Sequence, residues 1–178
     1  MSDSAALAGR RIAIFVENDF EDVELTGPRD ALAAAGATVV IVGPTAPADF
    51  KGKKLGTVVS SDLAAGAAKI ADFDALVIPG GYAPDKMRMR HAMVDFTRDM
   101  FEAGKPVAAI CHAASLLISA NAVRGRTLTC WPSIAIDVKN AGGLYVDKPV
   151  VEDGNLITSR KPDDVPAFSD AIIRALSR

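Results

Sequence analysis

The sequence predicts an α/β fold in which a mostly parallel sheet carries helices on both faces. Short and almost continuously apolar runs alternate with segments of helical periodicity, which is typical of buried parallel strands joined by helices. Turn-forming residues mark segment ends, for example Gly36 after a helical segment and Gly43-Pro44 after an apolar run. No internal repeat or change in composition divides the chain, so we predict one domain over residues 11–178, preceded by a flexible tail of residues 1–10.

Four apolar runs are the strongest strand predictions, and we expect them to form the centre of the sheet. They cover residues 11–16, 38–42, 75–78 and 106–110. Weaker strand patterns occur at residues 56–60, 127–129, 144–146 and 156–158. Helices are expected at about residues 22–35, 89–103, 113–120, 134–141 and 164–176. The least regular stretch is residues 46–71, in which residues 51–54 indicate a turn.

The composition is that of a soluble globular protein, with 49% hydrophobic and 24% charged residues. A net charge of −2 gives no electrostatic reason to expect nucleic acid or an anionic membrane as a partner. No apolar run approaches the roughly 20 residues that a membrane span needs, and the first ten residues lack a secretory signal pattern. Only two cysteines occur, so we expect no disulfide framework and a cytoplasmic location.

Cys111 is the most informative residue, because it stands where a buried apolar run stops and a helical pattern begins. This position places a sulfur at the carboxyl edge of a parallel sheet and at the start of a helix, which favours thiolate over thiol. Most free cysteines are merely small core residues, but the turn position favours a nucleophilic role here. Cys130 has no helix directly behind it, and we interpret it as core or pocket wall.

Histidine is scarce, which shortens the search for a general base. His112 follows the candidate nucleophile, and we favour it as general acid or base, oriented by a carboxylate from elsewhere. The alternative is that His112 contributes only its backbone N–H to an oxyanion hole. His91 lies among basic residues near a helix start and is expected on the solvated surface.

Two further segments follow apolar strands and should meet Cys111 at the same edge of the sheet. The first is the acidic segment of residues 17–24, where a carboxyl close to the sulfur would have to be protonated; the sequence alone does not choose which one. The second contains Gly80 and Gly81, which permit close approach of N–H groups and can form an oxyanion-stabilising loop or a simple turn. Asp85 in the same segment is typical of a helix cap.

Taken in order, these motifs resemble the ThiJ/PfpI superfamily, and the similarity is closest to its PfpI branch. The matching segments cover nearly the whole chain from Arg11 onward, namely residues 18–25, 78–85, 107–112, 125–126, 140–142 and 153–160, with Pro162. Activities in that superfamily include intracellular cysteine peptidase, cofactor-independent glyoxalase, and protein or nucleotide deglycase. The resemblance implies a flavodoxin-like three-layer sandwich with a cysteine elbow.

The resemblance also implies roles for individual residues. Cys111 is the nucleophile, Glu21 is the carboxylic acid close to its sulfur, and Asp85 pairs with His112 of a neighbouring subunit. The PfpI pattern has glutamate at the position of Asp85 and glycine where this chain has Ala113. Trp131 stands where relatives carry a smaller aromatic residue or histidine, and we expect it to wall the site.

We therefore expect a cofactor-independent cysteine enzyme that acts on small reactive carbonyls, of glyoxalase or deglycase type, in stress protection. Cys111 would add to an aldehyde carbon while N–H groups near Gly81 and His112 hold the oxyanion. The first alternative is an intracellular cysteine peptidase of PfpI type that acts on peptides. The second is a redox sensor or holdase in which Cys111 is oxidised. Self-association follows if Asp85 serves another subunit, and no metal is expected.

Overall fold

The computed structural model describes residues 6–178 and contains the α/β architecture that the sequence predicts. A seven-stranded sheet has the order β10-β11-β7-β6-β1-β2-β5, and every neighbouring pair is parallel except β10 and β11. Its strands are β1 (Arg11–Phe15), β2 (Thr38–Gly43), β5 (Leu63–Ala64), β6 (Ala75–Ile78), β7 (Val107–Ile110), β10 (Val150–Asp153) and β11 (Leu156–Ser159). Two small sheets flank it, formed by β3 (Asp49–Lys51) with β4 (Val58–Ser60) and by β8 (Thr127–Leu128) with β9 (Leu144–Tyr145).

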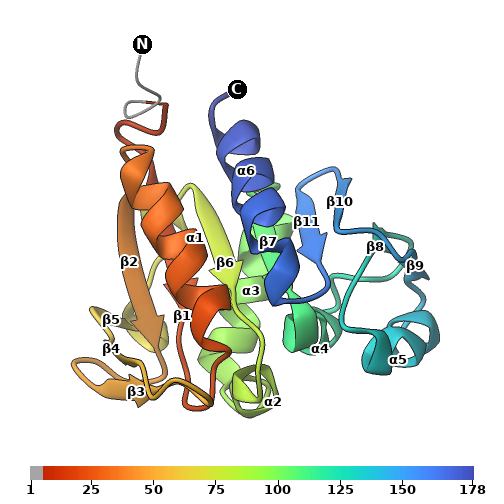
Figure 1. Cartoon of the computed structure of the whole chain (residues 1–178), viewed down its shortest axis with the longest axis horizontal. Coiled ribbons are helices and arrows are strands. Elements are labelled where there is room, and N and C mark those ends of the chain that lie inside the picture. The colour runs from red at the N-terminus through yellow and green to blue at the C-terminus, as the bar shows by residue number, and fades with distance from the viewer. Residues whose placement is uncertain (1–5) are drawn as a thin grey trace.

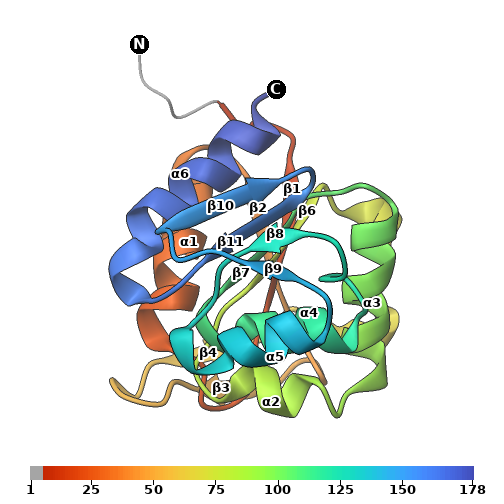
Figure 2. The same ribbon diagram turned by 90° about the vertical axis from the view of Figure 1, so that its right-hand side faces the viewer.

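Helices cover both faces of the large sheet, which gives the three layers expected of a flavodoxin-like fold (Figures 1 and 2). On one face, α1 and α6 pack against each other. On the opposite face, α3 packs against β6 and β7, and α4 packs against β7. The helices are α1 (Asp22–Ala34), α2 (Ala83–Met87), α3 (His91–Glu102), α4 (Ala114–Ser119), α5 (Ala135–Asn140) and α6 (Val165–Leu176). Short 3-10 turns occupy residues 65–67, 70–72, 111–113, 132–134 and 162–164.

The central strands are apolar along their whole length because both of their faces are covered. All residues of β6 and β7 are buried, and β1 is buried from its second residue onward. The core between the layers contains large side chains with no exposed surface, such as Phe15, Phe168 and Leu32. This rigid centre fixes the carboxyl ends of β1, β6 and β7 relative to one another.

The structure also contains elements that the sequence pattern did not indicate. β3, β5 and β10 are short strands at edges or in side sheets, where few residues need to be buried. The helix expected at about residues 89–103 is confirmed as α3, and α2 is a further short helix that the sequence pattern did not indicate; the extended backbone at Arg90 (φ −104°, ψ 97°) separates the two. Pro84 lies in the first turn of α2, a position that suits proline because no intrahelical N–H is needed there.

The start of the described chain is more ordered than expected. Residues 1–5 of the predicted flexible tail lie outside the described residues. Leu7, in contrast, is fully buried, and its N–H donates to the carbonyl of Ala35 at 2.9 Å. Arg10 is held by an ion pair to Asp74 at 3.3 Å. Over residues 6–178, no helix combines the length and apolarity needed to cross a membrane.

Candidate active site

Three loops meet at the carboxyl edge of the sheet, at the lower edge in Figure 1. They follow β1, β6 and β7, and the strand order reverses between β1 and β6, which is where ligand sites form in open α/β sheets. The loops are joined through their backbones. Phe20 forms an isolated antiparallel bridge with Gly81, and the Glu21 N–H donates to the Gly80 carbonyl at 3.1 Å. The predicted convergence of these segments is therefore present.

Cys111 lies at a sharp turn between β7 and α4. Its φ is +63°, in the left-handed region that non-glycine residues rarely adopt, and such strain costs on the order of 1–3 kcal/mol. The side chain is 7% exposed, and the backbone N–H groups of Gly81 and His112 act on its sulfur. An oxyanion hole was expected from N–H groups near Gly81 and His112, and these two donors lie in that region. The Cys111 sulfur and two backbone N–H donors therefore lie close together at this turn.

The carboxyl beside Cys111 belongs to Glu24, which corrects the expectation for Glu21. Glu24 is fully buried in α1, and its Oε2 accepts the Gly80 N–H at 2.8 Å. A Cβ built on Gly80 would lie 2.5 Å from Glu24 Oε2 and 2.7 Å from Cys111 Cβ, so the two side chains flank this glycine. Within residues 6–178, Glu24 Oε1 has no nitrogen or oxygen atom as hydrogen-bond partner. The side chain that hydrogen-bonds to this carboxyl is the Cys111 thiol.

The position of Glu24 in the sequence pattern indicates that it is buried. Glu24 precedes Pro28 and Leu32 at intervals of four residues, so all three share one face of α1. The two apolar residues are buried, which places the carboxylate on the helix stripe that faces the sheet. An acidic residue in the apolar phase of a helix is therefore the pattern that distinguishes Glu24 from its acidic neighbours.

The acid–base properties of this pair also differ from expectation. Burial raises the pKa of Cys111, the charge of Glu24 raises it further, and the N–H groups of His112 and Gly81 lower it only in part. The idea that position alone makes this sulfur a thiolate at neutral pH is therefore wrong. Burial also raises the pKa of Glu24 to about 8, so its carboxyl is mostly protonated at neutral pH. A proton on Glu24 removes the repulsion that opposes ionisation of Cys111.

Glu21 instead belongs to a charged group that includes Lys53 and Lys54. Its Oε2 lies 2.8 Å from the Lys53 ammonium, and its Oε1 lies 3.7 Å from that of Lys54. Lys53 also lies over the Tyr82 ring, 5.0 Å from the centroid. The sequence pattern at residues 51–54 indicates only a turn and gives no sign of this role of Lys53.

The turn that carries Lys53 is held by Asp22, the first residue of α1. Asp22 is 1% exposed and accepts backbone N–H groups of Lys54, Leu55 and Thr57 at 3.1, 3.2 and 3.3 Å. Burial alone would raise the pKa of Asp22, but these hydrogen bonds hold the pKa below its ordinary value. One buried carboxylate thus organises the connection between β3 and β4.

The rings of His112 and Trp131 lie near each other beside the cysteine turn. Their ring centroids are 6.2 Å apart, and the backbone N–H of Trp131 donates to the backbone carbonyl of Cys111 at 3.2 Å. Burial and the charge of Lys53 lower the pKa of His112, so the imidazole is neutral at pH 7. Asp85 is exposed on α2 and forms no ion pair within the described residues. Cys130 is fully buried, and His91 is exposed, as expected.

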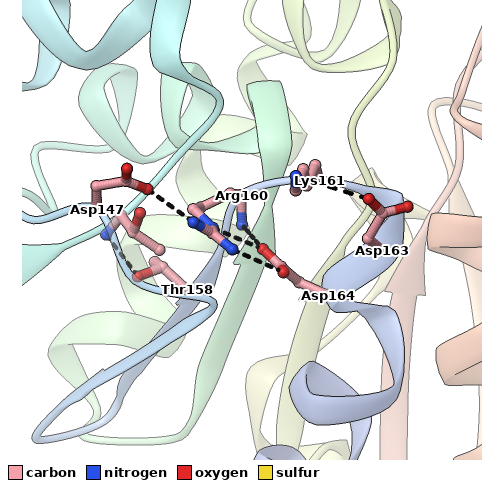
Figure 3. A network of polar contacts seen from close by, with 7 residues as sticks. Asp147, Thr158, Arg160, Lys161, Asp163 and Asp164 are labelled. Atoms are coloured by element: carbon pink, nitrogen blue, oxygen red, sulfur yellow. Dashed lines mark hydrogen bonds and ion pairs between the residues drawn. The ribbon is translucent and has the colours of Figure 1, made fainter.

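A polar network holds the neighbouring strand end (Figure 3). Ser159 on β11 pairs in register with Ile110 on β7, so the two strand ends lie side by side. The next residue, Arg160, donates to both carboxylate oxygens of Asp164 at 3.0 and 3.1 Å and to Asp147 at 2.8 Å. This network fixes the entry into α6 beside the cysteine turn. No group of three or more His, Cys, Asp or Glu side chains within residues 6–178 is arranged to hold a metal ion.

The backbone of Cys111 has left-handed φ at a strand-to-helix turn, and its sulfur lies beside a buried carboxyl and two N–H donors. This arrangement is typical of α/β proteins with a nucleophile elbow. The model of the DJ-1/PfpI family matches residues 10–175. The chain belongs to the DJ-1/PfpI family.

Individual relatives agree with this assignment. "Protein/nucleic acid deglycase 2" of Escherichia coli strain K12 is 46% identical over 168 residues, which are 94% of this chain and 98% of that protein. A two-domain protein of Anabaena variabilis, containing DJ-1/ThiJ/PfpI-like and ferritin-like domains, has a TM-score of 0.92 and 41% identity over 94% of this chain. This chain spans about half of that protein, 48% of its length. Drosophila melanogaster DJ-1beta has a TM-score of 0.87 and 30% identity, over 94% of this chain and 90% of that one.

Proposed function

We propose that the chain is a cofactor-independent cysteine enzyme of deglycase or glyoxalase type, which acts on small reactive carbonyls such as methylglyoxal or on their early adducts. The observation that carries the proposal is the arrangement of Cys111, where a strained turn holds the sulfur between two N–H donors and the carboxyl of Glu24. The name of the E. coli relative, a deglycase at 46% identity, supports the same class of reaction.

The first step forms a carbon–sulfur bond. Cys111 gives up its proton to the neutral imidazole of His112 and attacks the aldehyde carbon, and the electron pair of the carbonyl moves onto its oxygen. The N–H groups of Gly81 and His112 stabilise that oxyanion, which is worth most in a site from which water is excluded. Protonation of the oxygen gives a hemithioacetal. The proton is supplied by Glu24, whose pKa of about 8 keeps it protonated at neutral pH.

The remaining steps move a proton and add water. A base takes the proton from the carbon bonded to sulfur, and a proton is delivered to the adjacent carbonyl carbon, which converts the hemithioacetal into a thioester of a hydroxy acid. Water then hydrolyses the thioester and releases the free thiol. We assign the proton transfers to Glu24 and His112, since His112 is neutral at pH 7 and can accept a proton. The net change is addition of one water to the dicarbonyl.

Self-association belongs to the same proposal. Asp85 is exposed on α2, as a residue must be if it is to reach the His112 of a neighbouring subunit. A carboxylate at that imidazole would orient it and hold its positive charge when it accepts a proton. The absence of a nucleic-acid partner, predicted from net charge, stays a prediction, because the name of the E. coli relative includes nucleic acid. A cytoplasmic location and a role in stress protection likewise stay predictions.

The test compares dicarbonyl consumption by wild type, Cys111→Ala and Cys130→Ala. Both substitutions remove one buried thiol, so Cys130→Ala is the matched control for loss of a sulfur from the core. We expect Cys111→Ala to lose activity by at least about 10³-fold, because the substitution removes the proposed nucleophile. Full activity in Cys111→Ala would overturn the proposal. Cleavage of unfolded peptides by wild type without dicarbonyl consumption would replace it with the peptidase alternative.

A further inference from the structure

The turn between β3 and β4 places the Lys53 ammonium against Glu21 and Tyr82, beside the loops that surround Cys111. Lys53 is joined to the site by backbone contacts, because the residue before it, Gly52, forms an isolated bridge with Phe20. Phe20 in turn bridges Gly81, whose N–H acts on the Cys111 sulfur. The Lys53 N–H itself donates to the Phe20 carbonyl at 3.0 Å. Two backbone bridges, from Gly52 to Phe20 and from Phe20 to Gly81, thus connect the turn of Lys53 with an N–H donor to the Cys111 sulfur.

The side chain of Lys53 is also fixed, through contacts with Glu21 and Tyr82. Its ammonium lies 2.8 Å from Glu21 Oε2 and 5.0 Å from the centroid of the Tyr82 ring, and the side chain is 21% exposed. Lys54 makes a clear contrast, because its side chain is 63% exposed and its ammonium lies 3.7 Å from Glu21. Two adjacent lysines therefore differ in whether they are fixed at the site or extend into solvent.

Negative charge has to form at this place during the reaction. Ionisation of Cys111 puts one negative charge in a buried site that already contains the carboxyl of Glu24, and attack on a carbonyl moves that charge from the sulfur to the oxygen. Burial opposes that charge, and a nearby cation offsets the penalty. The charge of Lys53 acts on three groups of the site, namely Cys111, Glu24 and His112.

We propose that Lys53 is the cation that supports negative charge on Cys111 and on the carbonyl oxygen, and that Glu21 and Asp22 are positioning residues that hold the Lys53 ammonium in place. The inference rests on the proposed role of Cys111 as nucleophile. Glu21 fixes the ammonium directly, whereas Asp22 fixes the turn through the N–H groups of Lys54, Leu55 and Thr57.

The groups that face Cys111 come from each surrounding element, and their effects have distinct signs. Glu24 on α1 opposes ionisation of the thiol, and the N–H groups of Gly81 and His112 favour it. Lys53 favours it from the β3–β4 turn. Glu21 favours the protonated form of Glu24, which weakens the main repulsion. Glu21 thus contributes twice, once by holding Lys53 and once through Glu24.

The test measures the rate at which iodoacetamide alkylates Cys111 between pH 6 and 9, with the modified peptide identified by mass spectrometry. Iodoacetamide is neutral, so its approach does not depend on the charge of the variant. We expect Lys53→Met and Lys53→Gln to react about tenfold more slowly at pH 7.5, which corresponds to a rise of about one unit in the pKa of the thiol. Lys53→Arg, which keeps the charge, should stay within about twofold of wild type.

Lys54→Met is the matched control, because it removes the same charge from the next residue of the same turn. It should alkylate within about twofold of wild type. Equal rates for Lys53→Met and Lys54→Met would overturn the proposal, as would a rate for Lys53→Arg as low as that for Lys53→Met. Alkylation involves no carbonyl substrate, so its result does not depend on whether Cys111→Ala abolishes dicarbonyl consumption. Failure of the Lys53 proposal can therefore be distinguished from failure of the proposed function.

Discussion

Glu24 and Cys111 meet across Gly80, with no room for a side chain between them. The Gly80 N–H donates to Glu24 Oε2 at 2.8 Å, and a Cβ on this glycine would come within 2.5 Å of that oxygen and 2.7 Å of Cys111 Cβ. The glycine is needed here for space, since its φ is not in the left-handed region. The close packing of α1 and the cysteine turn around Gly80 therefore requires that position 80 has no side chain.

We predict that Gly80→Ala lowers kcat/KM by at least about 10²-fold and lowers the free energy of unfolding by about 1–3 kcal/mol, because the new methyl group must displace the carboxyl or the cysteine turn. Steady-state kinetics and urea denaturation measure the two effects. Gly66→Ala is the control, since a Cβ there would approach nothing closer than Ala92 Cβ at 4.0 Å. Unchanged activity in Gly80→Ala would show that the spacing between Glu24 and Cys111 is unimportant.

Much of this arrangement could be predicted from the sequence. The four central strands and the turn position of Cys111 followed from apolar runs and their ends, because strands buried on both faces have a distinct composition. The identity of the carboxyl did not follow, because the segment of residues 17–24 contains several acids and the resemblance pointed to Glu21. The choice depends on helix phase, which places Glu24 inward and leaves Glu21 at the N-cap position beside Lys53.

The state of the sulfur could not be predicted from position alone. The start of a helix, which favours thiolate, is visible in the sequence, whereas the burial of the sulfur, which opposes ionisation, is not. The structure has only a 3-10 turn over residues 111–113 before α4, so the helix contribution is small. Lys53 was missed for a similar reason, because its contact with the site depends on two backbone bridges that no local pattern reveals.

The raised pKa of Glu24 leads to a prediction about stability and pH. Its pKa is about 8 in the folded protein and 4.5 in the unfolded chain, so the folded state binds more protons between these values. The contribution of this group to stability is therefore complete below about pH 4.5 and is lost as pH rises toward 8. Glu24→Gln cannot ionise and should lack this loss. Urea denaturation at several pH values should show Glu24→Gln becoming more stable relative to wild type as pH rises, and a constant difference would contradict the prediction.

Asp22 should show the opposite dependence. Its folded pKa lies below the ordinary value of 3.8, so its stabilising effect is present above pH 3.8 and is lost as pH falls through the folded pKa. We predict that Asp22→Asn lowers the free energy of unfolding at pH 7 by about 1–3 kcal/mol, because an amide replaces a carboxylate that accepts three N–H groups. The control is Asp30→Asn, since Asp30 is exposed on the surface. Equal stability of the two variants at pH 7 would refute this assignment.

Exchange of subunits tests whether Asp85 completes the site of a neighbour. We predict that Asp85→Asn lowers kcat/KM by about tenfold or more, since the imidazole of His112 would lose the group that orients it, whereas Asp85→Glu keeps activity. If the two residues act from different subunits, mixing Asp85→Asn with inactive Cys111→Ala should restore activity, because some sites then combine an intact cysteine with an intact aspartate. Cys111→Ala mixed with Glu24→Gln is the control, and it should restore nothing, since Cys111 and Glu24 meet within one subunit. Failure of the first mixture, after gel filtration has shown an exchanging oligomer, would assign Asp85 a role within its own chain.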